Sequence, residues 1–309
     1  MDALRRPARG RPAAPAHLPP PGRPLRIGVV GAGRVGATLG AALERAGHRV
    51  VGVSAGSPAS LARAAALLPA APVVPVDSVP AGADLVLLAV PDDALPDLVA
   101  VLAPRLRAGQ VVAHTSGRHG LAVLAPAVAA GARALALHPV LPFSGTAADV
   151  DRLAGTSFGV TGDDDLLPLA HALVTGMGGV VEHVPDERRP LWHAALAHAA
   201  NHLTTLVNSS ADLLREAGAT EPRRVLAPLL DAALDGALHR GDAALTGPVA
   251  RGDAGTVRAH LEVLAAVAPE VLPSYVAMAR LTADRALASG VLDSARAGAL
   301  LEVLGSVAA

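Results

Sequence analysis

The chain has 309 residues with 51% hydrophobic residues, 1% aromatic residues, a formal net charge of -1 and no cysteine. This length is sufficient for two modest domains. The lack of cysteine excludes disulfides, thiolate nucleophiles and thiolate-bound zinc or iron–sulfur clusters, and it favours a reducing compartment, the cytoplasm. All 26 of the Lys+Arg residues are arginine, which excludes Schiff-base chemistry, a lysine general acid and a P-loop lysine.

The charge distribution and composition also limit the kinds of partner that the protein can bind. Arginines and acidic residues are interspersed, so there is no basic stripe for a phosphate backbone, and the few aromatic residues offer no platform for stacked bases (Phe143, Phe158, Trp192, Tyr275). No apolar run approaches the ~18 residues of a membrane span. We therefore expect neither a nucleic acid nor a membrane as partner.

The first residues differ in composition from the rest. Residues 1–24 are rich in proline and arginine and show neither apolar periodicity nor the apolar core of a signal peptide. They predict a disordered tail. A translation start placed too far upstream explains the same pattern equally well.

Regular structure is predicted from Leu25 onward. Short apolar runs alternate with segments of helical period, at 26–30, 49–53, 85–90, 111–114, 134–137, 158–161 and 180–184. This alternation is typical of an α/β fold with a mostly parallel sheet, here over residues 25–185. Two helix starts carry capping residues, Ser57 before Pro58 and Asp92. The Ala- and Leu-rich sequence that follows predicts an all-helical C-terminal domain over 186–309.

A glycine-rich turn follows the first run directly. It reads Gly31-Ala32-Gly33-Arg34-Val35-Gly36 and leads into a helical stretch. In this context the glycines allow a tight turn, close approach of a pyrophosphate and close packing of the helix. The motif predicts a Rossmann-type dinucleotide site, completed by Ala89, Val90 and Pro91 at the end of a later strand. An ordinary glycine turn between strand and helix is the alternative.

The end of the second strand bears on the choice of cofactor, because an acidic residue there binds the ribose 2′-hydroxyl of NAD and repels a 2′-phosphate. The residue there is Ser54, Ser57 follows shortly after, and no acid occurs in residues 54–60. With Arg34 and Arg63 nearby, these groups favour the phosphate of NADP over NAD. Alternatively, the serines only cap a helix.

Further polar residues follow later strands, whose carboxyl ends border the ligand crevice in such sheets. One strand ends in His114-Thr115-Ser116-Gly117, and another in His138-Pro139. Ser116 and His138 are therefore candidate catalytic residues. A buried structural role in hydrogen bonding is the alternative for each histidine.

The helix after residue 186 carries an uncharged polar stripe. At ~100° per residue, His193, Asn201, Thr204 and Asn208 fall on one face, while leucines such as Leu203 and Leu206 fall on the opposite, core-facing arc. Either His193 or His138 is the candidate for proton transfer, Asn201 and Ser116 are candidates for orienting a carbonyl, and Asn208 is a candidate for binding substrate. A polar helix–helix contact is the alternative.

Two other clusters contain side chains that can bind ligands. His198 and His202 stand at helical spacing for half of a zinc site, but no carboxylate ligand is evident nearby and no metal is expected. The segment 245–253 contains Thr246 and Arg251, a hydroxyl and a fixed cation able to hold a substrate carboxylate. Asp253 is expected to cap the next helix.

Taken together, these motifs resemble one family. GAGRVG at 31–36, AVPDD at 89–93, HTSG at 114–117, HAALAHAAN at 193–201 and LTGPVARGD at 245–253 are similar to the Rossmann-like proteins provisionally assigned as NADP oxidoreductases, whose C-terminal half is domain of unknown function 2520. The family is similar in plan to pyrroline-5-carboxylate reductase and ketopantoate reductase, and its helical half to 6-phosphogluconate dehydrogenase-like domains.

The resemblance implies an NADP-dependent reductase and leaves its substrate open. Our leading hypothesis is an NAD(P)-dependent oxidoreductase that transfers a hydride between NADP and a small carbonyl or imine substrate bearing a carboxylate. It also implies a homodimer formed through the helical domain. The lysine-based mechanism of ketopantoate reductases does not carry over, because this chain has no lysine. The alternative from a different class is a non-catalytic NADP-binding redox sensor or scaffold.

Overall fold

The computed structural model describes residues 23–306, so the predicted tail at 1–24 lies outside the described residues except for its last two positions. The chain divides into two compact units, the first ending at Ala197 and the second beginning at His198. This division falls inside the long helix α7 (Arg189–Glu216), further along the chain than the boundary that the sequence suggests at residue 185.

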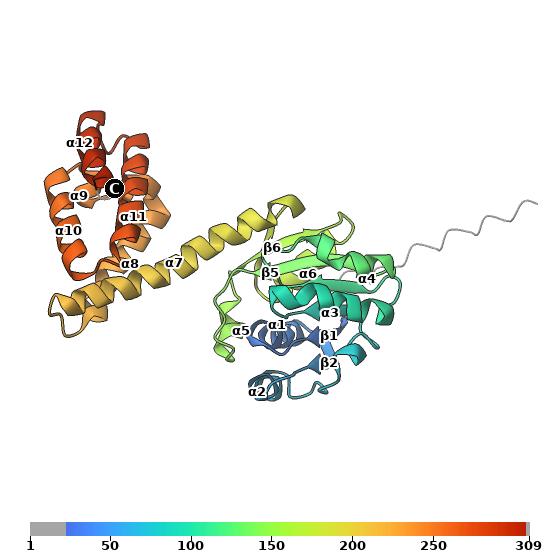
Figure 1. Ribbon diagram of the computed structural model, residues 1–309. Coiled ribbons are helices and arrows are strands. Elements are labelled where there is room, and N and C mark those ends of the chain that lie inside the picture. Colours follow the sequence, from blue (N-terminus) through green and yellow to red (C-terminus); the bar gives the residue numbers. More distant parts are fainter. Residues whose placement is uncertain (1–22, 307–309) are drawn as a thin grey trace, which may run out of the picture. The chain divides into compact units, whose positions relative to one another are not determined.

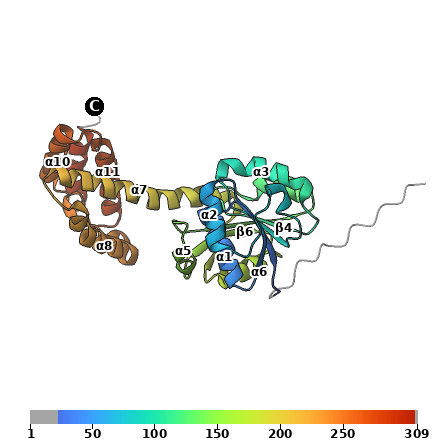
Figure 2. The ribbon, with the colours of Figure 1, turned by 90° about the horizontal axis from the view of Figure 1, so that it is seen from below.

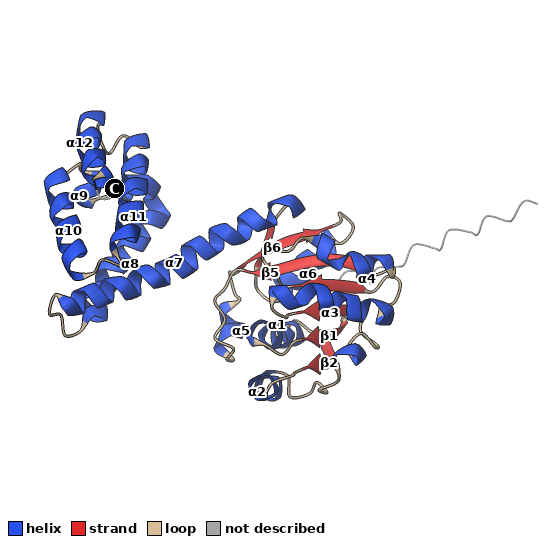
Figure 3. Ribbon diagram, in the orientation of Figure 1, coloured by secondary structure: helices blue, strands red, loops and turns tan. Residues whose placement is uncertain are grey.

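The first unit contains a seven-stranded sheet in the order β2-β1-β3-β4-β5-β6-β7 (Figures 1 and 3). The strands are parallel except for the pair formed by β5 and β6. Each of the seven predicted apolar runs is a strand: β1 (Arg26–Val30), β2 (Arg49–Ser54), β3 (Leu85–Leu88), β4 (Val111–His114), β5 (Arg133–Pro139), β6 (Ser157–Gly162) and β7 (Val180–His183). The predicted α/β fold with a mostly parallel sheet is confirmed.

Helices cover both faces of this sheet (Figure 2). They are α1 (Arg34–Arg45), α2 (Pro58–Leu67), α3 (Leu95–Leu102), α4 (Ala125–Ala129), α5 (Ala148–Arg152) and α6 (Leu167–Gly176). Successive side chains of a strand point to opposite faces of the sheet and pack against different helices. Ile27 packs with α1 and α6, whereas Val30 packs with α3 and α4. Each such buried side chain contributes roughly 1.5–3 kcal/mol, which is why the strands read as nearly continuous apolar runs.

The strand order positions a crevice. β1 lies between β2 and β3. The chain therefore adds β2 on one side of β1 and then crosses over to add β3 on the other side. In open α/β sheets, ligands bind at this reversal, beyond the carboxyl ends of the strands. The loops after β1, β3, β4 and β5 all lie at that edge, because these strands are parallel to one another.

The structure tests the capping predictions directly. Ser57 caps α2 and forms a capping box with Ser60, as predicted. Asp92 does not cap: Pro91 stands at the cap position of the following short turn, and the Asp92 carboxylate lies 3.6 Å from Arg118. An arginine within reach competes with the helix amides for that carboxylate. In the second unit, Asp253 caps α10 as predicted by accepting the Thr256 N–H.

The second unit is helical throughout its described part, as predicted (Figure 3). After α7 come α8 (Pro222–Arg240), α9 (Gly247–Ala250), α10 (Ala254–Val267), α11 (Leu272–Ala288) and α12 (Ser294–Gly305). Its buried core gathers α9 to α12, with Leu261 and Leu300 among its members. Because that core draws nothing from α7, the prediction that Leu203 and Leu206 face the core is wrong: they are 44% and 49% exposed.

No helix within residues 23–306 is both long enough and apolar enough to cross a membrane.

Candidate functional site at the carboxyl edge of the sheet

The glycine loop packs tightly against the end of β3. Gly31 has φ +95°, and a Cβ there would lie 2.5 Å from the Ala89 carbonyl oxygen. A Cβ at Gly36 would lie 2.1 Å from the Gly31 oxygen. At Gly33, by contrast, the nearest protein atom is 3.9 Å away. The protein's own packing thus requires the first and third glycines, whereas the second leaves open space next to the amino end of α1.

Serine hydroxyls near this loop are engaged by the protein itself. The Ser54 hydroxyl accepts the Gly31 N–H at 3.0 Å and is 4% exposed, so Ser54 holds the glycine loop from β2. The Ser57 hydroxyl accepts the Ser60 N–H at the start of α2. Their predicted role in holding a 2′-phosphate remains a prediction.

Two arginines flank the same loop. Arg63 donates from Nε to the Ala32 carbonyl at 3.3 Å. A Cβ at Gly145 would lie 2.9 Å from the Arg34 side chain and 3.1 Å from that of Arg63, so both stems reach the same spot. Two arginine side chains therefore lie beside the glycine loop, near the serine at the end of β2. Together they form a positively charged environment suited to binding a phosphate group.

Two of the predicted catalytic histidines meet above Gly117. A Cβ at Gly117 would lie 2.7 Å from His193 Cδ2 and 2.8 Å from His138 Nε2. The two imidazole rings pack edge to face, with centroids 6.1 Å apart. Only glycine allows this approach, so the loop after β4, the end of β5 and the start of α7 converge on one point.

Trp192 supports this pair from the side. Its indole Nε1 donates to His138 Nδ1 at 3.1 Å. The ring lies against β6, where a Cβ at Gly159 would be 2.9 Å from the indole nitrogen. His138 pairs with Gly159 across β5 and β6, so the tryptophan fills the space that the missing side chain leaves beside the histidine.

Arg189 fixes the start of α7 to the loop after β4. Its guanidinium is fully buried and donates to the carbonyl oxygens of Ser116 (2.6 Å), His119 (2.6 Å) and Gly159 (3.4 Å) and to the Thr161 hydroxyl (2.9 Å). These acceptors are uncharged. Burial lowers the pKa of Arg189 to about 10, so the residue is a cation at neutral pH.

Helical spacing connects Arg189 with the site. Trp192 and His193 follow it by three and four residues and therefore share its face of α7. Asp186, just before the helix, adds a second link by accepting the Leu121 N–H at 2.6 Å. These contacts fix the first turn of α7 in position next to His138.

The neighbouring residues His114 and Ser116 are hydrogen-bonded within the protein. His114 is fully buried, its Nε2 lies 3.2 Å from the Gly120 carbonyl oxygen, and burial followed by the Arg189 charge lowers its pKa to about 3. Its Nδ1 is buried without a hydrogen-bond partner among the described residues. The Ser116 hydroxyl accepts the His119 N–H at 3.1 Å. This bond leaves the hydroxyl proton available as a donor.

The remaining predicted residues belong to the second unit. Asn201, Asn208, Thr246 and Arg251 are all exposed. His198 and His202 contact each other through their Nδ1 atoms at 2.8 Å, and no group of three possible metal ligands occurs in the described part of the chain. The roles proposed for these side chains stay predictions.

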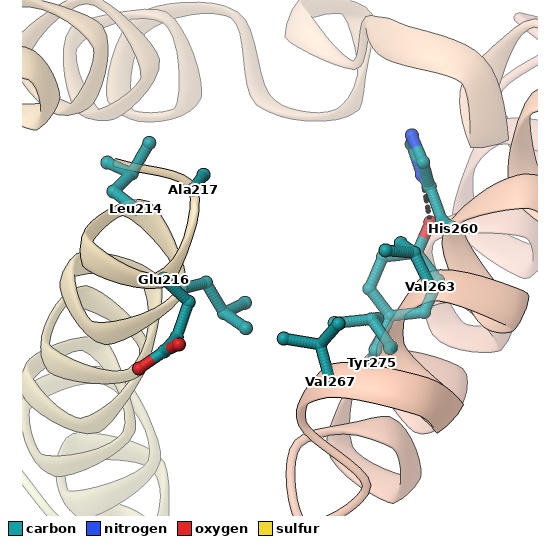
Figure 4. Close-up of a pocket in the computed structure, with 9 residues that line it drawn as sticks. Leu214, Glu216, Ala217, His260, Val263, Val267 and Tyr275 are labelled. Carbon is teal, nitrogen blue, oxygen red and sulfur yellow. Dashed lines mark hydrogen bonds between the residues drawn. The ribbon is translucent and has the colours of Figure 1, made fainter. Parts of the chain in front are cut away.

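The second unit also contains an apolar groove of about 470 Å³ that the sequence did not reveal (Figure 4). Leu214 from α7 and Ala217, in the turn just after it, line one side, and Val263 and Val267 from α10 line the other. His260 and Tyr275 are hydrogen-bonded at 2.8 Å in the same wall. None of the residues predicted for the site lines this groove.

Sequence reasoning missed two central residues, Arg189 and Trp192. Trp192 had one visible signal, since it is the only tryptophan in the chain and directly precedes His193. Arg189 had none, because it stands beside Arg188 in a charged segment that reads as solvent-exposed. Only the fold reveals that one of the two is buried and the other exposed.

Comparison with models of known protein families identifies both halves of the chain. Residues 12–139 match the model of a Rossmann-like domain, and residues 156–282 match the model of a domain of unknown function, DUF2520. The chain therefore carries both domains of the family that its motifs resemble, and that resemblance is confirmed. No curated protein matches the chain.

Solved structures share the fold along most of the chain. A provisionally assigned NADP oxidoreductase of Bacteroides fragilis is 22% identical over 84% of this chain and 98% of its own, with a TM-score of 0.73. Protein TM1727 of Thermotoga maritima is 21% identical over 85% and 99%, with a TM-score of 0.65. Pyrroline carboxylate reductase of Plasmodium falciparum, with NADP bound, is 9% identical over 85% and 98%, with a TM-score of 0.55.

Proposed function

We propose that this protein is an NADP-dependent oxidoreductase that transfers a hydride between the cofactor and a small carbonyl or imine compound carrying a carboxylate. The observation that carries the proposal is the shared sheet edge: the glycine loop follows β1, and His138, whose ring packs against His193 of α7, lies at the carboxyl end of β5, which runs parallel to β1. Similarity to an NADP oxidoreductase and to a reductase with NADP bound supports the same class.

The residues at the glycine loop fit a dinucleotide. The open space at Gly33 admits a pyrophosphate close to the backbone, and the amino end of α1 favours its negative charge. When bound, NADPH supplies the hydride. Arg34 and Arg63 hold the 2′-phosphate, and the end of β3 at Ala89, Val90 and Pro91 borders the cofactor.

The histidine pair supplies polar groups to the reacting centre. When a carbonyl carbon gains a hydride, its oxygen takes up the bond pair and then a proton. His193 provides that proton from the first turns of α7, and solvent returns it. His138 and Ser116 contribute hydrogen bonds that orient the carbonyl group. In the second unit, Asn201 is the proposed group for orienting a carbonyl, and Asn208, Thr246 and Arg251 are the proposed substrate-binding groups, with Arg251 as the anion-binding cation.

Cofactor binding and turnover test the proposal in sequence. Dissociation constants for NADPH and NADH are measured first, and the expected preference for NADPH is ~10-fold or more, the scale of one charge-assisted contact. A panel of keto acids and cyclic imines is then screened for NADPH oxidation at 340 nm. Tight binding without turnover of any compound would favour a non-catalytic NADP-binding protein. Equal affinities would contradict the assignment to NADP.

The assembly proposed for this enzyme is a homodimer formed through the helical unit. Most of the exposed large apolar side chains of the described residues lie in this unit, among them Leu203, Leu206, Val225, Leu229, Leu234, Leu238, Val263, Val267, Met278 and Leu281. Covering such a surface with a second copy removes it from water. Light scattering should return twice the chain mass of 30.8 kDa, and a monomer mass at micromolar concentration would contradict the dimer.

A further inference from the structure

The hydrogen bond between Trp192 and His138 determines which imidazole nitrogen carries the proton. An indole N–H can donate but cannot accept. Since Trp192 Nε1 lies 3.1 Å from His138 Nδ1, Nδ1 must be the unprotonated acceptor. A neutral His138 therefore carries its proton on Nε2.

That Nε2–H faces the space above Gly117. A Cβ at Gly117 would lie 2.8 Å from His138 Nε2 and 2.7 Å from the His193 ring, so both rings come this close to the loop only because residue 117 is a glycine. Among the described residues, Nε2 of His138 has no hydrogen-bond partner, whereas its Nδ1 is engaged by Trp192. The free N–H is available to a ligand beside His193.

The charges around His138 oppose a second proton on its ring. Burial, then the Arg189 cation, then His193 lower the pKa of His138 to about 4, while the Asp92 carboxylate acts weakly in the opposite direction. Arg189 is effective because its four acceptors are uncharged and it is shielded from water. His138 is thus a neutral donor, unable to act as a strong acid near pH 7.

We infer that Trp192 is a positioning residue that holds His138 in the Nε2–H form, so that His138 donates a hydrogen bond to the carbonyl oxygen of the substrate while His193 transfers the proton. This inference rests on the proposed function and narrows its substrate class. A carbonyl oxygen has lone pairs to accept that N–H, whereas a protonated imine has none and meets the buried Arg189 cation. The site therefore favours ketones or aldehydes over cyclic iminium compounds.

The tautomer itself is measured without any substrate. In protein labelled with ¹⁵N-histidine, long-range proton–nitrogen spectra distinguish a protonated Nε2 from a protonated Nδ1, and the signal lost in His138→Gln assigns the residue. We expect His138 to show only Nε2–H from pH 8 down to pH 6. In Trp192→Phe, which keeps an aromatic ring but removes the donor, both tautomers should appear. An Nδ1–H tautomer or an imidazolium in the native protein at pH 6 would overturn the inference.

Two substitutions of the histidine separate its donor from its acceptor function. The amide nitrogen of His138→Gln reaches the position of Nε2 and can donate there, whereas the shorter amide of His138→Asn lies near Nδ1 and can only satisfy Trp192. We expect His138→Asn to lower kcat by at least ~10², the scale of one oxyanion-type donor. His138→Gln should recover at least ~10-fold of that loss. Equal losses in the two variants would contradict the donor role.

The inferred preference for carbonyl over imine substrates can be tested independently of the tautomer and of the His138 variants. The native enzyme should reduce keto compounds with a kcat/KM at least ~10-fold above that for cyclic imines of the same size. Faster reduction of imines would overturn this inference and leave the proposed oxidoreductase function standing. Failure of both substrate classes would remove the proposed function, while the NMR spectra would still decide the role of Trp192.

Discussion

The two units of this chain bury their surfaces to very different degrees. In the first unit strands β1 to β6 are mostly buried, and even a charged group, Arg189, is buried and donates its hydrogen bonds to protein oxygens. In the second unit the core gathers four helices, while side chains such as Leu229 and Leu238 are 63% and 75% exposed. The second unit therefore exposes more large apolar side chains to water than the first.

This difference separates two kinds of residue along α7. Arg189, Trp192 and His193 belong to the first unit and contact its loops and strands. From His198 onward the helix belongs to the second unit, and most of its side chains are exposed or half-buried. Single substitutions in the first group should therefore have specific and large effects, whereas those in the second should act through surface and assembly.

The largest effect is expected at Arg189. Replacement by Met removes the donor for three carbonyl oxygens and a hydroxyl, all in a site without water access. We expect the free energy of unfolding to fall by about 3–5 kcal/mol. Urea denaturation followed by Trp192 fluorescence reports this loss within the first unit.

Arg188→Met is the matched control, because Arg188 is the exposed neighbour of Arg189. Its stability should stay within ~0.5 kcal/mol of the native protein. Similar losses for both arginines would contradict the view that burial makes Arg189 special.

The next largest effect is expected at His193. His193→Ala removes the proposed proton donor and should lower the single-turnover rate by at least ~10², the lower end of general acid catalysis. NADPH affinity and the thermal midpoint should change little, since the imidazole contacts His138 only edge to face. A lower midpoint with an unchanged rate would make His193 a packing residue.

His198→Ala, on the same helix but in the second unit, provides the comparison for that variant. It should retain the native rate. A loss as large as that of His193→Ala would contradict the separation of the two parts of α7.

Acid should weaken the first unit through His138. Its pKa is lowered from 6.5 to about 4 in the folded protein, so the unfolded chain binds the proton more readily. Stability is fully present above pH 6.5 and falls as the pH drops toward 4; the loss at pH 5 is about 2 kcal/mol. His138→Gln should reduce this slope when unfolding is measured between pH 7 and pH 5, and an unchanged slope would assign the acid effect to other groups.

A smaller effect is expected at Arg63. Arg63→Ala removes a guanidinium from the glycine loop and should reduce the preference for NADPH over NADH by ~10-fold, or about 1.4 kcal/mol. Binding of NADH should remain close to native, because it lacks the 2′-phosphate. Parallel titrations of both cofactors measure the change, and equal losses for the two would indicate damage to the loop rather than a phosphate contact.

Much of the first unit could be predicted because local patterns and global burial agree. Every strand was visible as an apolar run, and the Gly31 and Gly36 contacts follow from the spacing of the motif. Convergence of His138 and His193 was predictable in part, since carboxyl ends of parallel strands meet at one edge. The contact itself depends on Gly117, whose role becomes visible only when α7 returns to the sheet.

The rest depends on tertiary partners that no local pattern encodes. Asp92 has the sequence of a helix cap, but Arg118 stands close to its carboxylate. Leu203 and Leu206 have the spacing of a core face, yet the core of the second unit forms among α9 to α12. Arg189 and Arg188 are identical residue types side by side, and only the fold buries one of them.

Affinity for NADPH in Gly33→Ala tests the central assignment most directly. A Cβ at this position meets no protein atom closer than 3.9 Å and the backbone has φ -70°, so the variant should fold with an unchanged thermal midpoint. The added methyl occupies the space assigned to the pyrophosphate, and we expect the dissociation constant for NADPH to rise by at least ~10-fold. An unchanged dissociation constant in this stable variant would contradict dinucleotide binding at the glycine loop.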